Sequence, residues 1–522
     1  MLYKEVLFTY LLHSGSFVAV FTHRSFEFVI GMLGLLLAGC AFVPIDPTYP
    51  HERIRWMLED TQPAAILISH LTHAQLPLST ASSLIFLDAP RSASSILEAS
   101  PSHASLDGVA FVIFTSGSTG RPKASLNTHR ALVNQAVDFG RQVQLTSADV
   151  VFQFSSISFD VSVLDFFVAL CHGATLQLWH EGIWIDALMA ANDVTYLEIT
   201  PSALALIDPA DCPKMRCVAS TGETLPPHLA LQWASSDVLL FNPYGPSECC
   251  VHTTNCAIHA SDTMITIGKP MANLQVYILD EWMRPQPIGV AGELHVGGIG
   301  VSLGYLKRPE LTAAKFLDSP FGPGTLYKSG DLARWRGDGS VIHMGRMDTQ
   351  VKLRGQRVEL GEIEHASLQL SSVKEAVAQV YQPSKEEQRL VLYVTPMSVD
   401  ETALRSLLAI SLPGFMIPQA IIRLEQMPKT SNGKLDRGRL PQPLADARSM
   451  LAPRTAEETE VRKVFASVLR IDVEAIGVEM SFFELGGNSL SVLKLARKMS
   501  DMLGRSVHAS EIMQHPTVSA LA

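Results

Sequence analysis

The sequence predicts a large α/β N-terminal domain, a smaller α+β unit after it and an all-α domain at the C-terminal end. Three observations predict this order. Apolar strand-like runs alternate with helix-length segments over roughly the first 340 residues, which favours layered, largely parallel sheets. From Gly292 the sequence becomes Gly-rich and alternating, which is typical of antiparallel strands with tight turns. Near the C-terminal end, Val461, Val464, Phe465 and Val468 recur at helical spacing.

The elements of the large domain can be placed along the chain. The uncharged run Phe28–Ile45 approaches the length of a membrane-spanning helix, but glycines interrupt it. We therefore predict a buried helix over Leu33–Ala38 and a buried strand over Cys40–Ile45, rather than a membrane segment. Five further apolar runs are predicted to be strands: Ala64–Ile68, Val109–Phe114, Val150–Phe154, Leu239–Phe241 and Met264–Ile267.

The rest of the chain divides into segments with different sequence patterns. Segments 292–306 and 327–348 predict antiparallel β structure, and residues 349–440 predict a small α+β unit. Residues 456–522 predict a compact helical domain, with Thr455 as a candidate N-cap of its first helix. The linker before this domain is marked by Pro441, Pro443 and Pro453.

Composition excludes several classes of function. The chain has 522 residues, which is roughly three to four domains at about 150 residues each. Charged residues make up only 18%, against about 25% in an average protein, which suggests a large buried fraction or surfaces that face partners. The net charge is −10, so little in the chain would neutralise phosphates, and a general nucleic-acid binder is not expected.

Cysteine usage bears on the compartment. The seven cysteines are scattered and none forms a CxxC pair, so the sequence indicates neither a zinc site nor a disulfide framework. The chain also lacks an Asn-x-Ser/Thr glycosylation site. Both features fit a reducing compartment, and we expect a cytoplasmic protein.

The sharpest local motif is FTSGSTGRPK at 114–123, which follows a predicted strand. Its glycines leave backbone N–H groups free to point into one concavity. The hydroxyls of Ser116, Ser118 and Thr119 and the ammonium of Lys123 would complete a cradle for an anion. The spacing differs from the GxxxxGK[ST] P-loop, and a flexible Gly/Ser turn is the alternative by composition alone.

Further motifs follow in chain order and together resemble one family. They are LLAGCAFVPIDPTYP (36–50), FTSGSTGRPK (114–123), SFDVS (158–162), NPYGPSE (242–248), GELHVGGIGVSLGYL (292–306), YKSGDLARW (327–335), GRMDTQVKLRGQRVELGEIE (345–364), LPGFMIP (412–418), NGKLDR (432–437) and LGGNSL (485–490). The set resembles the AMP-forming adenylating enzymes, and more closely the adenylation domains of nonribosomal peptide synthetases followed by a peptidyl carrier domain.

The resemblance implies a domain plan. A large lobe over 1–347 would contain layered sheets and helices plus a small β-barrel-like part. A small, mobile α+β lobe would span 348–440, a linker 441–455 and an all-α four-helix carrier domain 456–522. The family's first motif, a Thr-Tyr-x-Glu-Leu stretch, is missing, so we expect an N-terminally truncated large lobe.

The resemblance also implies how ATP would be held. Tyr244 would stack on adenine, Asp331 would accept both ribose hydroxyls, as an acceptor-only carboxylate can, and Arg346 would support that contact. His343 stands where the family commonly has an aromatic residue. The β- and γ-phosphates would bind the loop formed by Thr115, Ser116, Gly117, Ser118, Thr119, Gly120 and Lys123.

Three residues would serve catalysis by the same resemblance. Glu248 would hold Mg²⁺, a hard cation that prefers a carboxylate plus phosphate oxygens. Lys434 would bridge the substrate carboxylate and the α-phosphate, where a cation stabilises the charge that develops. Asp348 would be the hinge of the small lobe. One orientation would bring Lys434 to the site, and the other the segment Lys352–Gln356 with a tunnel for a thiol. Taken singly, each of these residues could be structural.

In the carrier domain, Ser489 precedes an apolar helical pattern. The resemblance implies that Ser489 carries covalent 4′-phosphopantetheine. A simple helix N-cap is the alternative for a serine at this place.

The resemblance further implies a substrate pocket. SFDVS places Asp160 where these domains hold the α-ammonium of an amino acid, and a buried carboxylate needs such a cation. Glu198 is the unusual member, because a second carboxylate would favour a basic or hydrogen-bond-donating side chain, unless the neighbouring His252 pairs with it. We rank polar or basic side chains ahead of plain aliphatic ones. The implied pocket is lined by Asp160, Val161, Leu164, Glu198, Ala219, Thr221, Pro243, Val251, His252 and Lys434.

These expectations describe an enzyme that activates an α-amino acid as its adenylate with ATP and Mg²⁺, then loads its own carrier domain as a thioester. The expected partners are the amino acid, a phosphopantetheinyl transferase and condensation or other synthetase domains, with no nucleic acid and no membrane. The alternatives are the loading end of an aminoadipate-type carboxylic acid reductase, an acyl-CoA-type ligase, and a non-catalytic relic or binding module. Asp160 and the carrier domain argue against the ligase.

Overall fold

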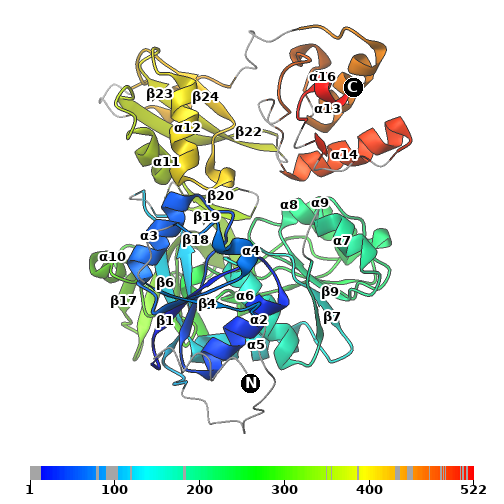
Figure 1. Ribbon diagram of the computed structural model, residues 1–522. Coiled ribbons are helices and arrows are strands. Elements are labelled where there is room, and N and C mark those ends of the chain that lie inside the picture. The colour runs from blue at the N-terminus through cyan, green and yellow to red at the C-terminus, as the bar shows by residue number, and fades with distance from the viewer. Residues whose placement is uncertain are drawn as a thin grey trace. The chain divides into compact units, whose positions relative to one another are not determined.

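The computed structural model describes residues 13–77, 82–89, 104–117, 120–179, 184–348, 350–353, 355–384, 387–429, 435–443, 451–469, 471–482, 485, 487, 489–505, 507, 511–512 and 515–522. The chain falls into two compact units (Figure 1). The first holds most residues up to Arg357, and the second holds most residues from Val358 onward. The two units are described separately below.

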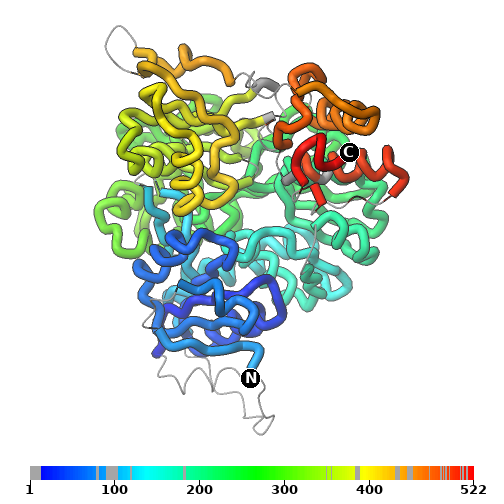
Figure 2. The backbone as a smooth tube through the Cα atoms, turned by 45° about the horizontal axis from the view of Figure 1, so that its top comes forward, coloured from blue at the N-terminus to red at the C-terminus, as the bar shows by residue number. Residues whose placement is uncertain are grey.

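The first sheet of unit 1 has six strands in the order β4-β3-β1-β2-β5-β6. Every neighbouring pair up to β5 is parallel, and β6 joins β5 as an antiparallel edge. The tube in Figure 2 traces this sheet in blue and cyan. Its strands are β1 (Phe17–Phe21), β2 (Ala41–Pro44), β3 (Ala65–Ile68), β4 (Ser83–Phe86), β5 (Val109–Thr115) and β6 (Lys123–Thr128).

Helices cover both faces of this sheet, so its strands are buried on both sides, as parallel strands usually are. On one face α2 packs through Phe28, Met32 and Leu35, together with parts of α5 and α6. On the other face α3 packs through Ile54 and Met57. The helices are α2 (Phe26–Leu37), α3 (His51–Thr61), α4 (His70–His73), α5 (His129–Gln142) and α6 (Asp160–Cys171).

The second sheet of unit 1 packs on the other side of α5 and α6, through Phe139, Leu164 and Val168. Its order is β13-β11-β10-β9-β7-β8, parallel except for the edge pair β11–β13. The strands are β7 (Val150–Phe152), β8 (Thr175–Gln177), β9 (Tyr196–Ile199), β10 (Cys217–Ser220), β11 (Leu239–Phe241) and β13 (Ala257–Ile258). The helices of this region are α7 (Trp184–Ala190), α8 (Pro201–Leu204) and α9 (Pro227–Ala234).

The later part of unit 1 is antiparallel, as its alternating Gly-rich sequence predicts. β15, β16, β18 and β17 form one sheet, and β19 pairs with β18. A small pair, β12–β14, and a hairpin, β20–β21, complete the β structure. The bounds are β12 (Thr254–Asn255), β14 (Lys269–Pro270), β15 (Leu274–Leu279), β16 (Gly292–Gly298), α10 (Pro309–Lys315), β17 (Phe316–Asp318), β18 (Thr325–Trp335), β19 (Val341–Arg346), β20 (Gln350–Leu353) and β21 (Gln356–Glu359).

Unit 2 begins with a small α+β part. Its sheet has the order β22-β23-β24, antiparallel between the first two and parallel between the last two. A core of Val377, Val391, Tyr393 and Met427 lies on one face. The elements are α11 (Leu360–Ser367), β22 (Glu375–Ser384), β23 (Glu387–Thr395), α12 (Glu401–Ser411) and β24 (Ala420–Arg423).

The C-terminal part of unit 2 is helical. Phe465 and Phe482 meet edge to face at 5.0 Å between ring centroids in its core. The Thr455 hydroxyl accepts a hydrogen bond from the Glu458 amide, so Thr455 caps the first helix as predicted. The described helices are α13 (Ala456–Leu469), α14 (Ser489–Leu503) and α16 (Val518–Leu521).

Two sequence predictions need correction. The helix predicted over Leu33–Ala38 begins earlier, at Phe26, because Ser25 caps it and glycine is tolerated where the helix packs closely on the sheet. The strand predicted over Met264–Ile267 is wrong, because that segment is irregular and the nearest strand is the short β14. No helix among the described residues is long and apolar enough to cross a membrane.

Candidate active site

The anion-loop motif lies where the predicted strand ends. β5 finishes at Thr115, Ser116 and Gly117 follow, and the chain returns into β6 at Lys123. A side chain at Gly117 would meet the Arg121 carbonyl oxygen at 2.0 Å, so the tight turn requires glycine. Gly120 has a positive φ of 82°. Ser118 and Thr119, which are expected in the same loop, lie outside the described residues.

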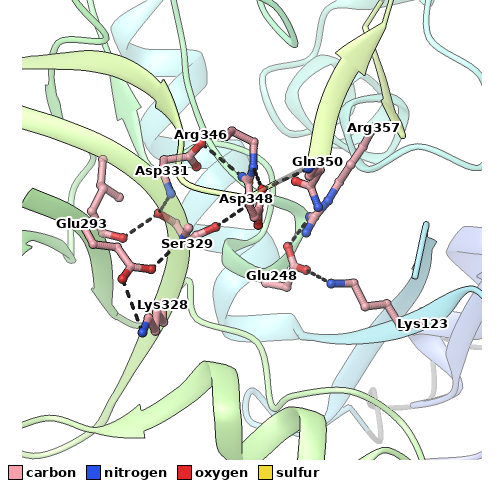
Figure 3. A network of polar contacts seen from close by, with 12 residues as sticks. Lys123, Glu248, Glu293, Lys328, Ser329, Asp331, Arg346, Asp348, Gln350 and Arg357 are labelled. Atoms are coloured by element: carbon pink, nitrogen blue, oxygen red, sulfur yellow. Dashed lines mark hydrogen bonds and ion pairs between the residues drawn. The ribbon is translucent and has the colours of Figure 1, made fainter. Parts of the chain in front are cut away.

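Glu248 is fully buried and belongs to a network of polar contacts (Figure 3). Its Oε2 atom lies 2.7 Å from the Arg357 guanidinium, and its Oε1 atom lies 3.4 Å from the Lys123 ammonium. Tyr305 donates its hydroxyl hydrogen to Oε1 at 2.7 Å and accepts from Lys123 at 3.2 Å. Gly245 permits the preceding turn, because a side chain there would meet the Val251 carbonyl oxygen at 1.9 Å.

The charges around Glu248 decide its protonation. Burial alone would raise the pKa of Glu248, but the positive charges of Arg357 and Lys123 outweigh burial and hold the pKa well below its ordinary range. Glu248 is therefore a carboxylate that is already compensated by cations of the chain itself.

Asp331 is buried in the sheet formed by β18 and β19, and three side chains hold it. Tyr244 donates its hydroxyl hydrogen at 2.5 Å, and Arg346 donates at 3.1 Å. His343 places its Nε2 atom 3.1 Å from the same carboxylate. Burial raises the pKa of Asp331, but the bond to His343 and the charge of Arg346 bring it well below its ordinary range. His343 therefore makes a polar contact with Asp331 at the position where the family commonly has an aromatic residue.

Arg346 links this cluster to the expected hinge residue. Its guanidinium forms two bonds of 2.7 Å with the carboxylate of Asp348 and a third, of 3.1 Å, with the Ser329 carbonyl oxygen (Figure 3). Such a bidentate pair fixes the geometry of both side chains. Asp348 is therefore anchored within unit 1.

Asp160 begins α6 and is buried, with 7% of its surface exposed. One of its oxygens accepts from the Val161 amide at 2.9 Å, and no described cation lies within ion-pair distance. Burial raises the pKa of Asp160, although donors from Ser247 and Val161 lower it in part. This carboxylate is the group that a cationic ligand would satisfy.

The open question about Glu198 has a structural answer. Its Oε1 atom lies 2.8 Å from Nε2 of His252, and both side chains are at most 1% exposed. Tyr196 donates to the other oxygen at 3.4 Å. Of the two alternatives for Glu198, the structure has the one in which His252 pairs with it.

Several other expected pocket residues contact one another. Leu164 from α6, Ala219 from β10 and Val251 belong to one buried cluster, and Val161 packs against it. The Thr221 hydroxyl donates to the Pro243 carbonyl oxygen at 3.2 Å. Residues separated along the sequence therefore meet in one buried cluster, and Thr221 contacts Pro243.

Two expected residues, Lys434 and Ser489, belong to the later part of the chain. Lys434 lies outside the described residues. Ser489 is described as the first residue of α14, which is where the motif predicts it.

Sequence reasoning assigned no role to two neighbours of the site, Arg357 and Tyr305, and it named Lys352 and His343 without their contacts. Arg357 and Lys352 lie in a quoted motif, but nothing local in that motif indicates which carboxylate each approaches. Lys352 places its Nζ atom 5.7 Å from the centre of the Tyr244 ring, and burial lowers its pKa. Contacts of this kind depend on the hairpin β20–β21 folding back over residues far away in sequence.

The residues fit magnesium only together with phosphates. Within the described ranges, no three or more His, Cys, Asp or Glu side chains gather where they could hold a metal. Mg²⁺ is usually held by one or two carboxylates plus substrate phosphates, and Glu248 next to Lys123 is a carboxylate of that kind. In the present arrangement, however, both oxygens of Glu248 already accept from protein groups.

Comparison with known families decides the assignment. Residues 10–306 match the AMP-binding enzyme family. The chain belongs to the AMP-binding enzyme family. Residues 362–434 match the AMP-binding enzyme C-terminal domain, and residues 459–522 match the phosphopantetheine attachment site. The predicted adenylation domain and the carrier domain after it are therefore confirmed.

Relatives of this AMP-binding enzyme are peptide synthetases. It is 37% identical to tyrocidine synthase 3 of Brevibacillus parabrevis, over 98% of this chain and 8% of that protein. It is also 37% identical to gramicidin S synthase 2 of Aneurinibacillus migulanus, over 97% of this chain and 12% of that protein. The chain thus spans about a tenth of the length of these relatives.

Solved structures agree with the fold. A four-domain nonribosomal peptide synthetase bound to AMP and glycine matches 99% of this chain and 39% of its own length, with 32% identity and a TM-score of 0.60. An adenylation–carrier protein bound to a vinylsulfonamide inhibitor matches 100% of this chain and 89% of its own length, with a TM-score of 0.83. At 23% identity, that second likeness shows the fold alone.

Proposed function

We propose that the chain activates an α-amino acid as its aminoacyl adenylate and then transfers the aminoacyl group to a thiol carried on Ser489. The observation that carries the amino-acid assignment is the buried carboxylate of Asp160, which has no ion-pair partner among the described residues. An α-ammonium would supply the missing positive charge. The AMP-binding and phosphopantetheine attachment matches support the two half-reactions.

In the first half-reaction, a carboxylate oxygen of the amino acid attacks the α-phosphorus of ATP. The bond to the bridging oxygen breaks, and pyrophosphate leaves with the bonding electrons. Asp160 would hold the α-ammonium, Asp331 and Tyr244 would hold the nucleoside, and Lys434 would meet the two anions at the reacting centre. Magnesium, when bound, would neutralise phosphate charge beside Glu248.

In the second half-reaction, a thiol attacks the carbonyl carbon of the adenylate and AMP leaves. The 4′-phosphopantetheine group would supply that thiol on a long flexible arm from Ser489. The proposed partners are a phosphopantetheinyl transferase, which would install the arm, and further synthetase domains, which would consume the thioester.

The pocket supports a substrate side chain that can form hydrogen bonds. Glu198 and His252 are buried polar groups, and a purely aliphatic side chain would leave their remaining bonds unmet. Because His252 already gives Glu198 a polar partner at 2.8 Å, Glu198 does not require a basic substrate side chain. We therefore place uncharged polar side chains ahead of basic ones.

The test is exchange of labelled pyrophosphate into ATP, which depends on the amino acid present. The panel comprises the proteinogenic amino acids, ornithine, and several aryl and keto acids. Exchange with one or a few α-amino acids, abolished in Lys434→Ala, would support the proposal. Exchange with an aryl or keto acid alone would overturn the role of Asp160, and silence in folded protein would overturn the activity.

A further inference from the structure

Four hydrogen-bonded side chains join the segment just before Asp160 to the turn that follows β2. The hydroxyl oxygen of Tyr49 lies 2.7 Å from that of Ser158. The hydroxyl oxygen of Ser158 lies 3.1 Å from that of Ser156, and Ser156 donates to the Asp46 carboxylate at 3.0 Å. Sequence analysis assigned no role to any of these four residues.

The direction of this chain of bonds follows from the number of hydrogens. A hydroxyl carries one hydrogen, and an ionised carboxylate only accepts. Ser156 donates its hydrogen to Asp46, so the bond between Ser156 and Ser158 must use the hydrogen of Ser158. The bond between Ser158 and Tyr49 then uses the hydrogen of Tyr49, and burial keeps that hydrogen in place by raising the pKa of the tyrosine. All three bonds therefore point toward Asp46, and bonds aligned in this way strengthen one another.

The turn after β2 is held by bonds of its own. The second carboxylate oxygen of Asp46 accepts from the amide and the hydroxyl of Thr48, at 3.0 and 2.7 Å. The Tyr49 amide donates to the Asp46 carbonyl oxygen at 3.1 Å. The guanidinium of Arg53, in α3, lies 5.4 Å from the centre of the Tyr49 ring. Asp46 and Tyr49, the two ends of the chain of bonds, therefore belong to one fixed turn.

The start of α6 lacks a cap of its own. Phe159 occupies the N-cap position, and its side chain has no polar atom that could accept from the helix amides. The Phe159 amide donates to the Ser156 carbonyl oxygen at 3.0 Å, which closes a turn that contains Ser158. Asp160 is the next residue, and its carboxylate accepts from the Val161 amide at 2.9 Å. The hydroxyl bonds of the turn therefore fix the residues that lead directly into Asp160.

A second contact holds the same segment from the turn that follows β1. The guanidinium of Arg24 donates to the carbonyl oxygens of Phe154 and Ser155, at 3.2 and 2.8 Å. It also lies 4.2 Å from the centre of the Trp179 ring. Because β1 and β2 are parallel neighbours, the turns that follow them lie at the same edge of the first sheet. The first sheet therefore holds the segment that leads from β7 of the second sheet to Asp160.

We propose that Tyr49 is a positioning residue for recognition of the α-ammonium, because its hydroxyl bond to Ser158 holds the turn that orients Asp160. The inference rests on the proposed function. Tyr49 acts through Ser158 and the turn rather than on the substrate. Loss of its hydroxyl should therefore weaken binding of the α-ammonium and leave the nucleotide contacts of Tyr244 and Asp331 unchanged.

The test measures binding of two adenylate mimics to the full chain by calorimetry. Both mimics carry a sulfamate in place of the phosphate. One is built on the amino acid that gives the fastest pyrophosphate exchange, and the other on the matching carboxylic acid with hydrogen in place of the α-ammonium. Tyr49→Phe should weaken binding of the first mimic about threefold to tenfold, because a buried hydrogen bond is lost, and leave binding of the second unchanged. In pyrophosphate exchange, the KM for the amino acid should rise by a similar factor while the KM for ATP stays the same.

Two further variants complete the design. Ser158→Ala breaks the same chain of bonds, so the double variant with Tyr49→Phe should lose no more affinity than the weaker-binding single variant, as coupled neighbours do. Tyr277→Phe is the matched control. It removes a tyrosine hydroxyl in the same unit, from a ring that stacks on Phe321 at 4.4 Å, and should leave the binding of both mimics unchanged.

Three results would overturn the inference and leave the proposed function intact. The first is unchanged binding of the mimic that carries the α-ammonium in Tyr49→Phe. The second is an equal loss for both mimics or a raised KM for ATP, which would show a general structural role. The third is full additivity of Tyr49→Phe and Ser158→Ala. Absence of exchange with any amino acid in folded, unaltered protein would instead overturn the proposed function, and the inference with it.

Discussion

Asp160 and Glu198 are two buried carboxylates of the pocket, and their different partners give them different roles. Glu198 has His252 at 2.8 Å, so a polar side chain of the protein already faces it. Among the residues that the structure describes, Asp160 has only neutral donors within hydrogen-bond distance, so its carboxylate calls for a cationic ligand. Sequence reasoning identified both acids through the motif order, but it could not decide between the two alternatives for Glu198, which depend on a distance between β9 and a distant loop.

The first prediction concerns the pH dependence of substrate binding. Because burial raises the pKa of Asp160, the carboxylate that binds an α-ammonium is lost as pH falls through that raised value. The KM for the amino acid should therefore rise on the acid side, starting above the ordinary aspartate pKa. Asp160→Asn should raise KM at neutral pH about tenfold or more and remove this acid limb from the pyrophosphate-exchange profile. An unchanged acid limb in the variant would contradict the role of Asp160.

The second prediction concerns stability. His252→Ala should destabilise unit 1 by about 1–3 kcal/mol, because it leaves the buried carboxyl group of Glu198 without its polar partner. The double variant with Glu198→Gln should recover part of that loss, since it removes the orphaned carboxyl group. Chemical denaturation of the single and double variants measures both effects. A double variant no more stable than His252→Ala would show that the pair is not coupled.

At the scale of elements, sequence periodicity predicts those helices and strands whose positions are set by burial and by local turns. The strand over Val109–Phe114 and the loop after it appear as β5 and its turn, because an apolar run followed by Gly and Ser leaves few alternatives. The segment Met264–Ile267 has the same apolar character but is not a strand. Its main chain bonds to other partners, such as the bond from the Ile267 amide to the Val341 carbonyl oxygen. Tertiary contacts therefore determine the conformation of that segment.

The third prediction belongs to helix α13. Thr455→Ala should lower the local stability of α13 by about 1 kcal/mol, because it removes the side-chain acceptor for the Glu458 amide. Thr459→Ala is the matched control, because Thr459 is a partly exposed threonine within the same helix whose hydroxyl donates to the Thr455 carbonyl oxygen in the preceding turn. Amide hydrogen exchange of α13 in the full chain distinguishes them. Equal exchange in both variants would rule out a capping role.

At the scale of the whole molecule, the order of motifs predicted the two domain types that the family matches confirm. The contacts around Glu248 were not predictable, because Arg357 is one of several basic residues in its motif and only the fold of β20–β21 brings it to the site. The boundaries between the large lobe, the small lobe and the carrier domain stay a prediction.

The measurement that tests the central claim most directly is amino-acid-dependent exchange of pyrophosphate into ATP by the intact chain. The account predicts exchange with one or a few α-amino acids bearing hydrogen-bonding side chains, lost in Asp160→Ala and in Lys434→Ala but retained in Ser489→Ala, which blocks only the later loading. Exchange that is insensitive to Asp160→Ala, or no exchange with any acid in folded protein, would contradict it.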